Sequence, residues 1–131
     1  MPSIVLPIAA SIIAGPISAT VERVVDGDTV RATAQIWLDQ EVSVLVRVAG
    51  VDAPEIFRPK CDAERALARE AKAFVADFVA SGRITLRNIQ RDKYGGRVVA
   101  TVENENGEDL SSALSENGFA VEGMRGNWCS D

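Results

Sequence analysis

The sequence predicts a mainly β (α+β) fold, a small five-stranded barrel whose elements follow in the order β-β-β-α-β-β-α. Five short segments rich in β-branched residues are separated by turn residues, as is typical of strands. One long segment with helical periodicity interrupts them after the third. With 131 residues, of which 47% are hydrophobic and 25% charged, the chain has the composition of one globular domain.

The first three predicted strands follow one another from residue 20. Segments 20–25 and 29–38 are joined by Asp26-Gly27-Asp28, a turn sequence that indicates a hairpin. The third strand, 41–49, alternates between two faces. One face carries Val42, Val44, Val46 and Val48, and the other carries Ser43, Leu45 and Arg47.

The predicted helix begins near Asp62, which can cap it, and runs until Gly82. Its apolar residues form one wide stripe, made of Leu67, Ala71, Phe74, Val75, Phe78 and Val79. Two more strands are expected at 83–89 and 97–103, and a short helix at 110–117 is closed by Gly118. This order is that of the OB fold, a partly open barrel that mostly holds oligonucleotides and oligosaccharides, although the fold alone does not set the function.

The composition excludes several kinds of chemistry. The chain has no histidine, which removes Ser-His and Cys-His nucleophile pairs and histidine-bound metals, and two cysteines cannot complete a zinc site. The 19 acidic residues instead favour a hard cation such as calcium or magnesium.

The charge is unevenly distributed along the chain. The net charge of −5 by itself disfavours a nucleic-acid partner, but residues 58–97 carry ten Lys or Arg against five Asp or Glu. Eleven of the 14 basic residues are arginines, whose planar guanidinium grips phosphate at two points. This pattern is compatible with a phosphate-handling site that also holds a cation.

The first 19 residues carry no charge and end in Ile17-Ser18-Ala19, which predicts a signal peptide cut before Thr20. No Lys or Arg precedes the apolar run, so an uncleaved anchor and a buried strand are the alternatives. The predicted domain is 20–131, in a secreted or periplasmic protein. In an oxidising compartment Cys61 and Cys129 can form a disulfide that ties down the C-terminal tail, and the alternative is two unrelated thiols.

Four motifs carry the candidate chemistry: Asp26-Gly27-Asp28-Thr29, Arg47, Asp52-Ala53-Pro54-Glu55 and Asp92-Lys93-Tyr94-Gly95-Gly96-Arg97. Each alone is equally well explained as an ordinary turn or a solvated strand residue. Together, in this order and spacing, they resemble the thermonuclease, or staphylococcal nuclease-like, family. Its signature is a DGDT turn, an arginine five residues before D-T/A-P-E, and an arginine shortly after DKYG, and the resemblance spans about Val21 to Glu122.

The resemblance implies a calcium site. Asp28, Asp52 and the backbone carbonyl of Ala53 would bind Ca²⁺, with Asp26 as a carboxylate outside the immediate ligands. Glu55 would be the general base, or would orient the attacking water.

It also implies how the substrate is held. Arg47 and Arg97 would grip the scissile phosphate from two sides, while Lys93 and Tyr94 would contact the terminal phosphate of a nucleotide. Phosphodiester hydrolysis needs an activated water, a cation and positive groups around the phosphate. The residues of the calcium site, Glu55 and the two arginines would together meet these three requirements.

Two departures from the family pattern bear on these roles. The extra glycine before Arg97 shifts this arginine by one residue, which on a strand turns the side chain to the opposite face unless a glycine bulge at Gly95-Gly96 compensates. At the C-terminal end, Val121, Glu122, Gly123 and Met124 stand where the best-known members have tyrosines beside the base, and Trp128 is a substitute if the tail folds back.

The function expected from the resemblance is that of a calcium-dependent secreted nuclease. It would hydrolyse DNA and RNA with little sequence preference, favour single-stranded or frayed substrate, leave 3′-phosphate ends and act as a monomer. No stable protein partner and no membrane association after loss of the leader are expected. The alternatives are a non-catalytic OB-fold module that binds nucleic acid, and an exported structural or inhibitor-like domain.

Overall fold

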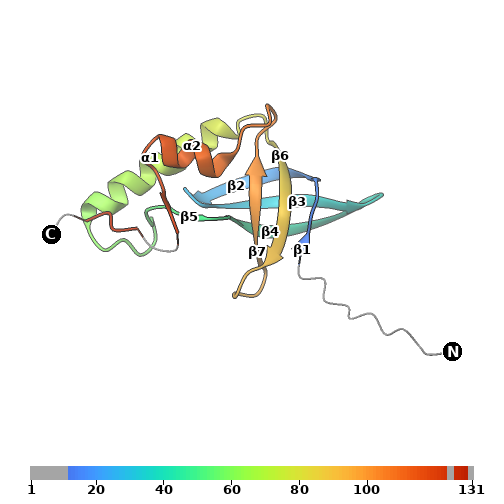
Figure 1. Cartoon of the computed structure of the whole chain (residues 1–131), viewed down its shortest axis with the longest axis horizontal. Helices are drawn as coiled ribbons and strands as arrows, with labels where there is room; N and C mark the ends of the chain where they lie inside the picture. The colour runs from blue at the N-terminus through green and yellow to red at the C-terminus, as the bar shows by residue number, and fades with distance from the viewer. Residues whose placement is uncertain (1–11, 124–125, 130–131) are drawn as a thin grey trace.

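The computed structural model describes residues 12–123 and 126–129, and its main feature is a closed five-stranded barrel (Figure 1). Residues 1–11 of the predicted leader and Met124 lie outside the described residues. The barrel strands neighbour one another in the order β6-β2-β3-β4-β7, and pairing of β6 with β7 closes the ring. They span Ile17–Asp26 (β2), Thr29–Trp37 (β3), Gln40–Val48 (β4), Arg83–Arg91 (β6) and Arg97–Glu103 (β7).

The pairing between strands confirms the predicted OB-type barrel. The three predicted strands before the helix pair antiparallel in sequence, whereas β4 and β7, which are far apart in the chain, pair parallel. The side chains that point inward are small or β-branched, as the alternation in the sequence predicts. Val46 and Val48 are fully buried, but Val42 is 42% exposed because it lies where the β3–β4 hairpin extends beyond the barrel.

Three short strands were not predicted. Ile12–Ile13 (β1) pairs with β6, and Val51–Asp52 (β5) pairs with Val121–Glu122 (β8) near the C-terminus. In addition, β2 begins three residues before the predicted start of the domain at Thr20. Ala19, the last residue of the predicted leader, is therefore a core residue, 6% exposed.

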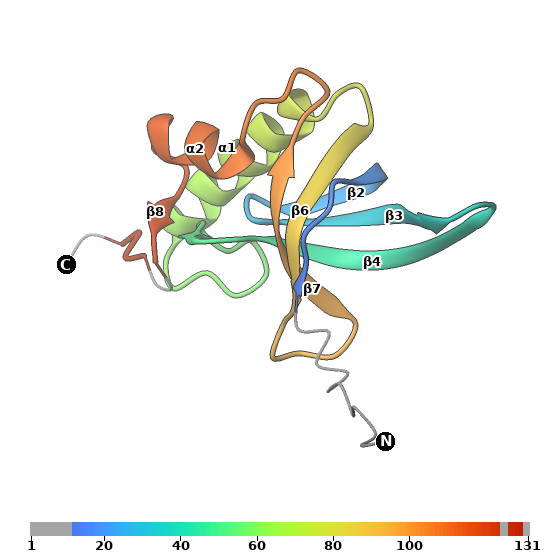
Figure 2. The ribbon, with the colours of Figure 1, turned by 45° about the vertical axis from the view of Figure 1, so that its right-hand side comes forward.

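Two helices lie side by side against one end of the barrel (Figure 2). The long helix α1 spans Asp62–Phe78, and the short helix α2 spans Leu110–Glu116. The inward stripe of α1 includes Val75, which is fully buried, and Phe74, whose ring lies 5.2 Å from that of Phe119. None of the helices in the described part of the chain is long and apolar enough to cross a membrane.

The cap of α1 differs from the prediction. Cys61, not Asp62, is the N-cap, and its Sγ accepts a hydrogen bond from the backbone N–H of Glu64 at 3.4 Å. Asp62 is instead the first helical residue, where a negative charge favours the helix dipole. The helix thus begins at a residue that is also bonded covalently to the C-terminal tail.

The β3–β4 hairpin ends in an apolar tip that extends away from the helices (Figure 2). Ile36, Trp37 and Leu38 are 50%, 70% and 79% exposed there. Trp37 is therefore exposed and is not part of the buried core.

Candidate active site

Arg47, the second-to-last residue of the strand β4, contacts two of the predicted metal ligands. Its guanidinium lies 2.8 Å from a carboxylate oxygen of Asp28 and 3.4 Å from one of Asp52, and it donates to the carbonyl of Val51 at 3.0 Å. These contacts use three of the five N–H donors of the side chain. The remaining donors have no partner among the residues that the structure describes, and they can bind an anion.

The turn between β2 and β3 holds Asp28 in a buried position. The Asp28 carboxylate is 4% exposed and accepts from the backbone N–H of Ala53 at 2.9 Å and from the Thr29 hydroxyl at 3.0 Å. Gly27 lets this turn approach α1, because a Cβ at that position would lie 2.9 Å from the Cβ of Ala71 and 3.1 Å from that of Ala53. Glycine is thus required here by close packing, and the DGD turn is more than a hairpin connection.

Carboxylates crowd together around Arg47. Burial, the hydrogen bond with Asp28 and the negative charge of Asp28 raise the pKa of Asp26 to about 8. Burial acts to lower the pKa of Arg47, but the neighbouring carboxylates of Asp28 and Asp52 outweigh it and raise that pKa. At neutral pH this shift favours the protonated form of Asp26, and the Arg47 guanidinium pairs with the carboxylates of Asp28 and Asp52.

The donor set fits a hard cation such as calcium. In residues 12–123 and 126–129 no three acidic or cysteine side chains converge as a ready-made metal cluster. Asp28 and Asp52 nevertheless share Arg47 as their common partner, and carboxylate oxygens are the ligands that Ca²⁺ prefers. Ala53 presents its backbone N–H to Asp28, so the predicted role of its carbonyl stays a prediction.

The loop after β5 positions Glu55 at the edge of the site. Pro54 is fully buried, whereas the side chain of Glu55 is exposed. Glu64 holds both ends of this loop. Its carboxylate, which is 5% exposed, accepts hydrogen bonds from the backbone N–H of Glu55 at 3.0 Å and from that of Lys60 at 2.8 Å. Sequence reasoning missed Glu64, although the spacing Cys61-x-x-Glu64 matches a capping-box pattern with cysteine in place of serine.

The extra glycine before Arg97 does not turn that arginine away. Gly96 adopts a positive φ of 77° in the turn, and β7 then pairs with β4 in an unbroken register from Arg97 to Ala100. Val99 pairs with Arg47, so Arg97, two residues earlier, is on the same face as Arg47. The inserted residue is thus absorbed by the turn rather than by a bulge within β7.

Arg97 also has local partners that the sequence did not indicate. Its Nε donates to the carboxylate of Asp92, and its guanidinium lies 4.9 Å from the centre of the Tyr94 ring. The ammonium of Lys93 lies 5.2 Å from the same ring. The turn between β6 and β7 therefore holds its two cations around one aromatic side chain.

A cleft of about 490 Å³ brings the predicted substrate-binding groups together. Its wall includes both arginines of the predicted phosphate clamp, two carboxylates at and after the end of β5, and the cationic and aromatic side chains of the β6–β7 turn. These residues are Arg47, Arg97, Asp52, Glu55, Lys93 and Tyr94. Asp28 and Asp26 lie behind Arg47 and do not line this cleft.

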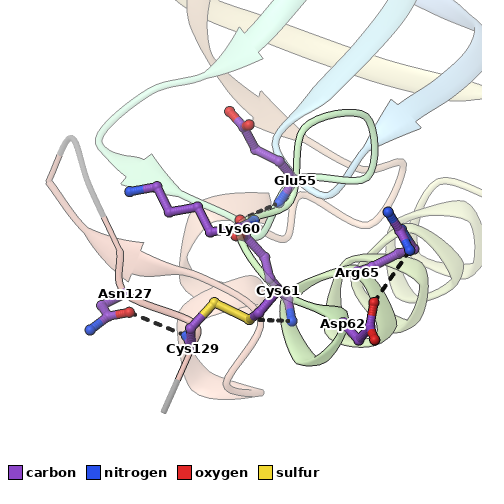
Figure 3. The surroundings of a disulfide bond; sticks show 8 residues. Glu55, Lys60, Cys61, Asp62, Arg65, Asn127 and Cys129 are labelled. Carbon is purple, nitrogen blue, oxygen red and sulfur yellow. Dashed lines mark hydrogen bonds and ion pairs between the residues drawn. A yellow bond between two sulfur atoms is a disulfide. The ribbon is translucent and has the colours of Figure 1, made fainter. Parts of the chain in front are cut away.

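The C-terminal tail reaches the same site through the disulfide. Cys61 and Cys129 are bonded, which confirms the predicted pairing, and Figure 3 shows the tail held beside the first turn of α1. Upstream of the disulfide, the backbone N–H of Gly126 donates to a carboxylate oxygen of Asp52 at 2.7 Å. This contact spans 74 residues of sequence, and no local motif signals it.

Comparison with known protein families agrees with the geometry. The sequence model of the family described as "Staphylococcal nuclease homologue" matches residues 45–127, which is more than half of the chain. The matched range contains Arg47, the segment 52–55 and Arg97, and it starts after the Asp26–Thr29 turn. A search of curated proteins finds no match.

Proposed function

The chain belongs to the staphylococcal nuclease homologue family, and from this premise we propose that it is a calcium-dependent, secreted endonuclease that hydrolyses DNA and RNA. The family assignment itself supports a nuclease-like or nucleic-acid-binding function. The observation that carries the finer proposal is the shared cleft, in which Arg47, Arg97 and Glu55 line one space. A phosphate in this cleft has two guanidiniums and a carboxylate within reach.

The roles follow from the surroundings of each side chain. Arg47 lines the cleft and has N–H donors beyond those in its ion pairs, so it binds the non-bridging oxygens of the scissile phosphate. Arg97 leaves Asp92 or shares it, and stabilises the negative charge that grows on the phosphate oxygens and on the leaving 5′ oxygen. Lys93 and Tyr94 hold the adjacent phosphate and sugar.

Glu55 is suited to take the proton of the attacking water because its side chain is exposed while its backbone is pinned by Glu64. Attack of that water on phosphorus forms the new P–O bond, and the bond from phosphorus to the 5′ oxygen breaks. The leaving 5′ oxygen takes a proton from solvent water and becomes a 5′ hydroxyl, while the other fragment keeps a 3′ phosphate.

Asp28 and Asp52 would hold the calcium ion, which when bound supplies Lewis-acid stabilisation of the anionic phosphate. Asp26 hydrogen-bonds the backbone N–H of Asp28 at 3.2 Å and so orients this ligand. Few protein ligands leave room for water and phosphate on the metal.

Two features support secretion. The first 19 residues are uncharged, and the Cys61–Cys129 disulfide suits an oxidising compartment.

The proposal is tested by cleavage of supercoiled plasmid and of single-stranded oligonucleotide with calcium, with magnesium and with chelator. We expect cleavage with calcium only, and products whose 3′ ends a polymerase extends only after phosphatase treatment. Arg47→Ala should lower cleavage by orders of magnitude, whereas Arg69→Ala, an exposed arginine on α1 outside the cleft, should not. Binding of DNA without cleavage under all three conditions would refute the enzyme and favour the non-catalytic module.

A further inference from the structure

A second, smaller pocket of about 240 Å³ lies beside the cleft and shares two residues with it. Asp52 and Glu55 line both spaces, so the candidate general base lies between them. The wall of the second pocket also includes Arg58, Lys60 and Trp128. The roles described above do not use Arg58 or Lys60, and the sequence named Trp128 only as a substitute for the tyrosines beside the base.

Trp128 is held at this pocket by two constraints. The disulfide at Cys129 fixes the chain directly after it, and the indole lies closely over Gly126, where a Cβ would come within 2.6–2.9 Å of three ring atoms. Gly126 is in turn hydrogen-bonded to Asp52. The indole is therefore an immobilised, half-buried aromatic wall next to the candidate site.

The pocket is lined by three acids and two cations, and the two cations can contact an anion at its rim. Arg58 and Lys60 are exposed, and neither forms an ion pair with any residue that the structure describes. Three acids face them, but Glu64 is buried and both of its oxygens accept backbone N–H groups. Figure 3 shows the carboxylate of Glu55 directed away from the disulfide.

An aromatic wall combined with flexible cations is the usual composition of a site for single-stranded nucleic acid, in which a base stacks on the ring and the phosphate contacts the cations. An endonuclease has nucleotides on both sides of the bond that it cuts. The cleft with Lys93 and Tyr94 accepts the nucleotide on one side. A pocket across Glu55 is in the position to accept the nucleotide on the other side.

We propose that this pocket is a second nucleotide-binding subsite, in which Trp128 stacks on a base while Arg58 and Lys60 contact the phosphate backbone. The assignment of the pocket to the far side of the scissile phosphate rests on the proposed function. Binding of a single-stranded segment to the pocket does not, and it can be measured without cleavage.

The chain contains two tryptophans, which permits a direct test. Trp37→Phe, at the exposed hairpin tip, leaves Trp128 as the single tryptophan reporter. Titration of this variant with an eight-residue oligodeoxythymidylate, in chelator so that it stays intact, should quench the emission of Trp128 with saturation. A thymidine dinucleotide, which is long enough for the cleft alone, should quench it less.

Affinity for the same octamer provides the matched comparison. Trp128→Ala should raise the Kd about tenfold, within the range for loss of one base stack, and Trp128→Phe should restore most of the affinity because it keeps a ring over Gly126. Trp37→Ala is the control and should leave the Kd unchanged. Circular dichroism and thiol titration confirm that the variants are folded and retain the disulfide.

The outcomes separate the two proposals. If the octamer binds by anisotropy while the emission of Trp128 is unaltered, or if Trp128→Ala binds it as tightly as the wild type, the subsite is wrong and the nuclease proposal stands. If quenching occurs in a protein that never cleaves, the subsite holds and the nuclease proposal falls. If the octamer does not bind the wild type in chelator, the subsite is refuted, and the nuclease proposal is decided by the plasmid assay with calcium.

Discussion

Removal of the Cys61–Cys129 disulfide should produce the largest stability change of any conservative substitution in this chain. The bond closes a loop with a sequence separation of 68 residues, and restriction of the unfolded chain over that length contributes about 4 kcal/mol in the entropic model. Cys61→Ser combined with Cys129→Ser removes the bond but keeps a side-chain acceptor for the N–H of Glu64, so the helix cap is retained.

Urea unfolding followed by circular dichroism measures this difference. With an m-value of about 2 kcal/mol/M, the midpoint of the double variant should lie about 2 M below that of the wild type. Dithiothreitol should shift the wild type by a similar amount and leave the double variant unchanged. A midpoint that moves by only a few tenths of a molar in both comparisons would refute the reasoning, because the unfolded chain would then not be the state that the bond restrains.

Three further predictions concern single side chains. Glu55→Gln should lower kcat by orders of magnitude in the plasmid assay while calcium still raises the melting temperature; a loss of that calcium effect would instead make Glu55 a metal ligand. Arg97→Ala should lower kcat by a factor of about 10³, and Arg91→Ala, at the exposed end of β6, should change it little; the reverse order would mean that the wrong arginine is assigned to the clamp. Asp109→Ala should cost about 1 kcal/mol at pH 7 by removing the N-cap of α2. Burial acts to raise the pKa of Asp109, but hydrogen bonds from two serines outweigh it and lower that pKa, so this stability is present above the unfolded pKa and is lost as pH falls through the folded one; unfolding curves for wild type and variant should therefore converge in acid.

The barrel could be predicted because the residue pattern that defines each of its elements lies within that element. Alternation of small and β-branched residues with polar ones defines each strand, and a single long apolar stripe defines α1. Given five strands and the position of the helix among them, few closed arrangements remain. The pairing of β5 with β8 was missed because two-residue strands have no periodicity of their own and form only when two segments far apart in the sequence meet.

The candidate site divides along the same line. The acidic turn, Arg47 and Glu55 could be predicted because they lie in short motifs with fixed spacing. Gly126 could not, because its backbone N–H reaches Asp52 across 74 residues of sequence. Glu64 was missed because its capping-box spacing has cysteine in place of serine. The orientation of Arg97 was open in the sequence because it depends on the φ of one glycine, which composition does not encode.

If the predicted leader is removed after Ala19, the position of this residue sets the order of cleavage and folding. Ala19 pairs with Ala34 on one side and with Ile84 on the other, so the backbone around the predicted cleavage point is part of a central strand. Peptidases bind their substrates as extended segments with free backbone groups, and a strand that is hydrogen-bonded on both edges offers none. A signal peptidase that removes residues 1–19 must therefore meet the chain during translocation, before the barrel closes. A precursor that folds first would keep its leader, because the last three residues of the leader are part of β2. Cleaved and uncleaved protein would then differ in mass at the N-terminus but would share every residue of the cleft.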